Sequence, residues 1–121
     1  MKYLILIQSN PRSLAAWDAM SDDERMAFGR DHLNLSGEMA EAGVLVASEG
    51  LADPGLATWV SVREGRTIPS DGPYAEVKEH LAGFYLIEAR DLNDAIQIAA
   101  KIPPAREGSI EVRPIRELDP F

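Results

Sequence analysis

Two side chains of this sequence combine the chemistry and the setting that a small acid–base site requires. His32 falls in a run whose apolar residues recur at helical spacing, so its imidazole shares a stripe with apolar side chains. Asp71 stands directly before Gly72-Pro73, a rigid turn that can fix a carboxylate in space. A carboxylate on one ring nitrogen would hold the tautomer and raise the proton affinity of the other nitrogen. The pair therefore predicts His32 as a general acid–base and Asp71 as its orienting partner.

Each of these residues also has a simpler interpretation. A lone histidine on an apolar helix face is more often a buried side chain that is hydrogen-bonded to a backbone carbonyl. An aspartate before Gly-Pro commonly accepts a backbone N–H and organises the turn. In either case His32 needs a partner, because an unsatisfied buried ring N–H costs about 1–3 kcal/mol.

Three further residues are candidate ligand contacts. Tyr74 offers a hydroxyl close to the turn, and Lys78 could bind a substrate carboxylate as a point charge. Glu49 interrupts a strand that is otherwise small and apolar, and it would supply a second acid if it points into an open sheet face. Strand parity groups Glu49 with Leu45 and Ala47, unless a bulge at the following glycine shifts the alternation.

Cofactor and metal chemistry find no support in the sequence. His80 is the second of two histidines and lies at no metal-ligand spacing from His32. The chain contains no cysteine, which removes disulfides, thiolate catalysis and zinc–thiolate sites. Neither a glycine-rich phosphate loop nor a Gly-x-Ser-x-Gly elbow occurs. We therefore expect a site that uses no cofactor and no metal.

Composition narrows the class of protein. A chain of 121 residues with 45% hydrophobic residues forms one globular domain, which we assign to residues 1–121. Twenty acidic residues against twelve basic ones give a net charge of −8, which disfavours nucleic-acid binding. No apolar stretch approaches the ~20 residues that cross a bilayer, and the apolar N-terminal run is too short for a signal peptide. The expectation is a soluble cytoplasmic protein with no membrane contact.

Periodicity and turn residues define the elements that must position these side chains. Ser21-Asp22-Asp23-Glu24 is a capping box that opens a long helix, and Gly43 stops it. Pro114 argues that the last strand lies at a sheet edge. The predicted strands cover 4–7, 44–51, 56–63, a short extended piece ending at 69, 83–89 and 110–113. The predicted helices cover 12–20, 22–42 and a segment from 92 to before Pro103-Pro104.

The order of these elements is that of a ferredoxin-like α+β fold with an extra β-hairpin segment. Two helices can cover only one face of such a sheet, yet the central strands offer apolar side chains to both faces. A second copy of the same sheet is the simplest cover for the open face, so the pattern predicts a homodimer. The alternative cover is the short helix over 12–20 together with the segment 66–82, which would keep the chain monomeric.

Residues 71–79, DGPYAEVKE, closely resemble the DGPFAETKE motif of the DGPF family, within the YCII-related superfamily. The similarity continues through Met1–Ile7, the helix cap, His32, Glu49-Gly50-Leu51, Gly83–Ile87 and the segments around 102–106 and 111–114. It implies a dimeric α+β barrel and a suspected histidine–aspartate site, which falls here on His32 and Asp71. The chain departs from the motif at Tyr74, Val77 and His80, which replace Phe, Thr and Gln.

The resemblance also bears on function. YCII-like proteins are similar to muconolactone-isomerase-type barrels, whereas many relatives are encoded beside extracytoplasmic-function sigma factors, which implies a regulatory partner. The leading hypothesis is a cofactor-free small-molecule enzyme of isomerase, lyase or hydrolase type, with its cleft between sheet and helix near a dimer interface. The alternatives are a non-catalytic module associated with a sigma factor, and a ligand sensor with the same pocket and no turnover.

Overall fold

The computed structural model of the protein describes residues 1–72, 79–103 and 109–117. The sequence-predicted elements are present at nearly the expected positions. The bounds are β1 (Lys2–Ser9), α1 (Pro11–Asp18), α2 (Asp22–Glu41), β2 (Leu45–Gly50), the short 3₁₀ helix η1 (Pro54–Leu56), β3 (Thr58–Arg63), β4 (Arg66–Asp71), β5 (His80–Glu88), α3 (Leu92–Ala99) and β6 (Ile110–Pro114).

Four strands form one antiparallel sheet in the order β2-β5-β1-β6. The apolar strands β1 and β5 are central, as their two-sided apolar pattern predicts. The last strand, which ends at Pro114, lies at an edge, which confirms the expectation drawn from that proline. With α2 and α3 as the connections, the chain follows a βαββαβ order and is compatible with the expected α+β fold.

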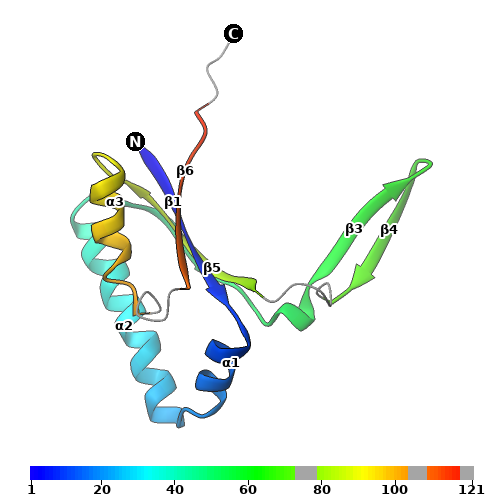
Figure 1. Ribbon diagram of the computed structural model, residues 1–121, viewed down its shortest axis with the longest axis horizontal. Coiled ribbons are helices and arrows are strands. Elements are labelled where there is room, and N and C mark those ends of the chain that lie inside the picture. The colour runs from blue at the N-terminus through cyan, green and yellow to red at the C-terminus, as the bar shows by residue number, and fades with distance from the viewer. Residues whose placement is uncertain (73–78, 104–108, 118–121) are drawn as a thin grey trace.

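The core lies between this sheet and the helices α2 and α3, which cover one sheet face (Figure 1). Tyr3 and Ile5 of β1 pair across the sheet with Ile87 and Tyr85 of β5, and all four side chains are buried. Their helical partners are also buried: Leu35 and Met39 of α2, Ala95 and Ala99 of α3, and Ile102 beyond α3. None of the helices in the described residues is long and apolar enough to span a bilayer.

Local signals explain where the helices begin and end. The Ser21–Glu24 capping box is formed in both directions, and Gly43 follows α2 with a φ of 72°, where a side chain would be strained. Asp91 caps α3, and its side chain accepts a hydrogen bond from the Asp94 backbone N–H. Ala42 continues the helical spacing of Leu35 and Met39, but it is exposed because it is the C-cap of α2.

The opposite sheet face is also apolar, and neither α2 nor α3 covers it. Leu4 pairs with Leu86, and Leu6 pairs with Phe84, so these four side chains share the face away from the core. The short helix α1, one part of the alternative cover considered from sequence, lies beside the first turns of α2 instead (Figure 1). Residues 66–71, another part of that cover, belong to a hairpin.

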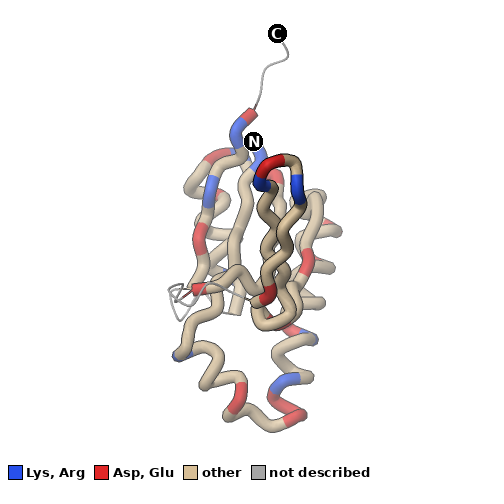
Figure 2. Tube along the Cα trace, turned by 90° about the vertical axis from the view of Figure 1, so that its right-hand side faces the viewer, with Lys and Arg blue, Asp and Glu red and all other residues tan. Residues whose placement is uncertain are grey.

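That hairpin is formed by β3 and β4 and makes a sheet of its own. Glu64 and Gly65 at its tip both have positive φ, of 51° and 74°, as the favoured two-residue hairpin turn requires. The hairpin stands apart from the main sheet, on the side away from the helices (Figure 1). Figure 2, which looks from that side, shows the hairpin in front of the sheet.

Candidate functional site

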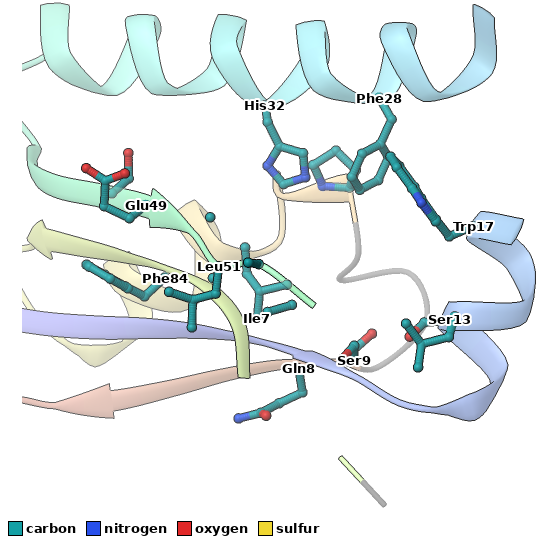
Figure 3. A pocket seen from close by; sticks show the side chains of 18 of the residues that line it. Ile7, Gln8, Ser9, Ser13, Trp17, Phe28, His32, Glu49, Leu51 and Phe84 are labelled. Carbon is teal, nitrogen blue, oxygen red and sulfur yellow. The ribbon is translucent and has the colours of Figure 1, made fainter. Parts of the chain in front are cut away.

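An open cleft of about 790 Å³ lies where α1 and the first half of α2 meet the ends of β1, β2 and β5. Figure 3 shows side chains from these elements around it. Most of the wall is apolar, but several polar side chains also line it, including the carboxylates of Glu49 and Asp53. The apolar lining includes Ile7, Leu14, Trp17, Phe28, Leu51 and Phe84, and the polar lining includes His32, Tyr85, Ser36 and Ser48. An apolar wall with a few polar groups is the usual character of a small-molecule site.

His32 is the polar centre of this cleft. It lies half-buried on the face of α2 that also carries Leu35 and Met39, one turn and two turns further along. Its Nδ1 lies 2.9 Å from the hydroxyl oxygen of Tyr85, a buried residue of the central strand β5. Phe28, one turn earlier on α2, packs edge-on against the imidazole with ring centroids 4.7 Å apart. The ring is therefore held on two sides by groups of the fold itself.

The environment favours the neutral imidazole. Burial lowers the pKa of His32 below its ordinary value of 6.5, because desolvation penalises the charged form, and nearby Asp31 acts in the opposite sense. The contact with the Tyr85 hydroxyl occupies Nδ1, whichever of the two groups donates. Nε2 is then the ring nitrogen that remains for a ligand. It is a proton acceptor when Nδ1–H donates to Tyr85, and a donor when Tyr85 donates to Nδ1.

Two serine hydroxyls lie on the same surface as this pair. Ser36 follows His32 by four residues on α2, so it occupies the same helix face. Ser48 of β2 is the cross-strand neighbour of Tyr85 and shares its sheet face. Both line the cleft and can donate to or accept from a ligand oxygen.

An aromatic wall closes the α1 side of the cleft. Trp17 of α1 packs edge-on against Phe28, with centroids 5.7 Å apart. The Arg25 guanidinium lies 5.2 Å from the centre of the Trp17 ring, and its Nε and Nη2 donate to the Trp17 carbonyl at 3.2 and 3.1 Å. These contacts tie α1 to α2 and fix the width of the cleft at this end.

The structure does not bring the predicted pair together within one chain. Asp71 is exposed at the end of β4, opposite Thr58, and it does not line the cleft. The ring nitrogen that has a side-chain partner, Nδ1 of His32, contacts the Tyr85 hydroxyl and not a carboxylate. The predicted ligand contacts Tyr74 and Lys78 lie outside the described residues.

Glu49 lines the cleft at the edge of the sheet and is exposed. It pairs with Phe84, so its side chain belongs to the sheet face opposite the one that carries Tyr85. The irregularity in β2 falls between Leu45 and Ala47 rather than at Gly50, so Glu49 shares a face with Ala47 but not with Leu45. In Figure 3 it lies well apart from the imidazole.

Sequence reasoning missed Tyr85, because it stands in the apolar run of β5 and reads as a core residue. One signal was available. A tyrosine inside a buried strand needs a partner for its hydroxyl, and a histidine on the helix that covers the strand is a natural candidate. Ser36 and Ser48 gave no comparable signal. Among the described residues, no group of three or more His, Asp or Glu side chains is arranged to hold a metal ion.

The fold and the cleft define a class of small α+β protein in which one sheet carries two helices and a histidine–tyrosine pair lies inside an open cleft. The YCII-related domain matches residues 1–119, so the chain belongs to the YCII-related family. This confirms the relationship indicated by residues 71–79. The chain is also 36% identical over 117 residues to an uncharacterized protein of Rhizobium meliloti (strain 1021), an alignment that covers 95% of this chain and 92% of that protein.

Proposed function

We propose that the cleft binds a small molecule with an apolar body and a carbonyl-type oxygen, and that His32 exchanges a proton with it. The observation that supports this most directly is the 2.9 Å contact between Nδ1 of His32 and the Tyr85 hydroxyl. It fixes the ring and leaves Nε2 for a ligand. The largely apolar wall would bind the body of such a molecule and exclude water from its reacting end.

The chemistry that suits this arrangement is proton transfer next to a carbonyl or lactone. A neutral imidazole, favoured here by burial, removes a proton from the carbon beside the carbonyl and returns it to another atom of the same molecule. Ser36 or Ser48 would donate a hydrogen bond to the oxygen on which negative charge develops. Tyr85 acts as a positioning residue, because it holds the ring without needing to touch the ligand. Isomerase, lyase and some hydrolase reactions all contain such a step.

The test uses the native protein with a panel of small carbonyl, lactone and carboxylate compounds. Trp17 lines the cleft, so binding is followed by its fluorescence, and turnover is followed by direct detection of product. His32→Gln keeps a hydrogen-bonding side chain but removes the titrating group, and His80→Gln is the matched control outside this cleft. The proposal expects turnover that His32→Gln abolishes and His80→Gln preserves. Binding without turnover would indicate a sensor or regulatory module, and no binding at all would reject the cleft as a site.

The proposed assembly is a homodimer in which the sheet faces opposite α2 and α3 meet. Leu4, Leu6, Phe84 and Leu86 form an apolar layer on that face, and among the described residues no helix lies over it. A second copy would bury this layer at a two-fold interface, which needs no other partner. Tyr74 and Lys78 remain proposed ligand-binding residues on the basis of sequence, whereas Tyr85 takes the positioning role that sequence assigned to Asp71. A cytoplasmic location remains a prediction.

A further inference from the structure

The β3–β4 hairpin exposes apolar side chains that its own chain does not cover. Val60 and Val62 are 65% and 66% exposed, and every residue of the two strands is exposed. A two-stranded hairpin without a surface to pack on is marginally stable in water. The exposed apolar side chains therefore indicate that the hairpin packs on a partner surface.

Register separates the two faces of the hairpin. Val60 opposes Pro69, and Val62 opposes Thr67, so one face carries small and apolar side chains along most of its length. Thr58 and Asp71 form the last pair of this face, at the base of the hairpin. This surface is called the valine face below.

The other face is of mixed character. Trp59 opposes Ser70, and Ile68 opposes Ser61, but the pair nearest the tip is Arg63 opposite Arg66. Two arginines side by side are best solvated by water. We therefore expect this face, and not the valine face, to point toward solvent.

The position of the hairpin indicates what the valine face would meet. Figures 1 and 2 agree that the hairpin stands on the side of the sheet away from the helices. This is the side of the apolar layer that contains Leu4, Leu6, Phe84 and Leu86, of which Leu6 is buried and the other three are half-buried within one chain. A second chain seated on that layer would lie next to the hairpin.

We propose that the β3–β4 hairpin is an arm that packs its valine face on a second copy of this chain. The proposal rests on the face-to-face dimer of the previous subsection and specifies what holds it. Under two-fold symmetry each copy gives one arm and receives one, so both exposed hairpins are covered in one closed assembly. No surface of this kind is left over to continue into a filament.

The arm also gives Asp71 a different role from the one predicted. Because Asp71 shares the valine face, its carboxylate is directed toward the second copy and not toward the His32 of its own chain. The acid that sequence assigned to the histidine site thus becomes a residue of the interface between the two copies.

The test compares dimer dissociation constants by analytical ultracentrifugation over a range of concentrations. Val62→Asp places a charge on the valine face, and Ser61→Asp places the same charge on the neighbouring residue of the other face. The arm predicts a dimer weakened by on the order of tenfold or more in Val62→Asp, and little change in Ser61→Asp. The double variant Val60→Thr/Val62→Thr keeps β-branched side chains while removing apolar surface. It tests the arm in place of Val62→Asp if that variant does not fold.

The outcomes distinguish the arm from the dimer on which it rests. A native chain that is monomeric at all concentrations rejects the dimer, and the arm with it. A native dimer whose dissociation constant is the same in Val62→Asp, Val60→Thr/Val62→Thr and Ser61→Asp rejects the arm alone. A dimer weakened by Ser61→Asp as strongly as by Val62→Asp also rejects the valine face as the contact.

Discussion

Nδ1 of His32 lies 2.9 Å from the hydroxyl oxygen of Tyr85, and this contact joins helix α2 to the central strand β5. The tyrosine is buried, and the imidazole is half-buried at the wall of the cleft. The same contact therefore contributes to stability and sets the orientation of the proposed acid–base group.

Tyr85→Phe should lower the free energy of unfolding by about 1–3 kcal/mol, because Nδ1 of a half-buried imidazole loses its partner. Tyr3→Phe is the matched control. Tyr3 is equally buried in the same sheet, but among the described residues its hydroxyl makes only a 3.9 Å contact with the sulfur of Met1. Urea denaturation of the two variants measures the difference. Equal losses would mean that the Tyr85–His32 contact adds nothing to stability.

Stability should fall as the pH drops below the ordinary histidine pKa of 6.5. Burial lowers the pKa of His32 in the folded chain, so between that lowered value and 6.5 the unfolded chain binds more protons than the folded one. The free energy of unfolding therefore rises with pH through this window, and the contribution of His32 is complete above 6.5.

The measurement is the midpoint of urea unfolding at a series of pH values from 5 to 8. His32→Gln should show a flatter profile than the native protein in the window below 6.5, whereas His80→Gln should keep the native dependence on His32. A profile that His32→Gln leaves unchanged would contradict the assignment.

Much of the fold follows from local sequence signals. The Ser21–Glu24 capping box, the Asp91 cap and Pro114 each set a boundary or an edge by chemistry within a few residues, and each was predictable for that reason. The buried residues of α3 were harder to predict from the sequence. Ala95 and Ala99 are buried there, but Leu92 and Ile96 are nearly half exposed, because the sheet below the helix selects which apolar residues it contacts.

The site was only half predictable. His32 stands out because an imidazole on an apolar stripe is conspicuous in the sequence. Its partner is not, since Tyr85 lies 53 residues away and is brought to it by the pairing of β5 with β1 and the packing of α2 on that sheet. Asp71 was a candidate because it stands before a Gly-Pro turn. The hairpin that contains Asp71 is separate from the main sheet, and no local sequence pattern indicates this separation.

Gly83→Ala should destabilise the pairing of β2 with β5 by about 1–3 kcal/mol. A Cβ at this position would lie 2.9 Å from the backbone oxygen of Glu49 and 3.4 Å from the Cα of Gly50, and backbone atoms cannot rotate away. Gly37→Ala is the control, since nothing lies within 4 Å of an added Cβ in α2. It should stabilise the chain by about 0.5–1 kcal/mol through helix propensity. Thermal or urea unfolding should thus shift in opposite directions for the two substitutions.

The arginine pair at the tip of the hairpin gives a test of its local stability. Arg63 and Arg66 are directly opposed, and no ion pair found among the described residues involves either of them. Like charges at opposed positions destabilise a hairpin, and opposite charges stabilise it. Arg66→Glu should therefore slow amide hydrogen exchange in β3 and β4, by roughly two- to fivefold at low salt.

A double-mutant cycle separates this pairing from other effects of each substitution. Arg63→Glu alone should slow exchange to a similar extent, whereas Arg63→Glu/Arg66→Glu restores a pair of like charges and should return exchange close to the native rate. Additive slowing in the double variant would show that the two side chains do not interact. High salt should reduce the difference between native and single variants, because it screens charges at an exposed hairpin tip.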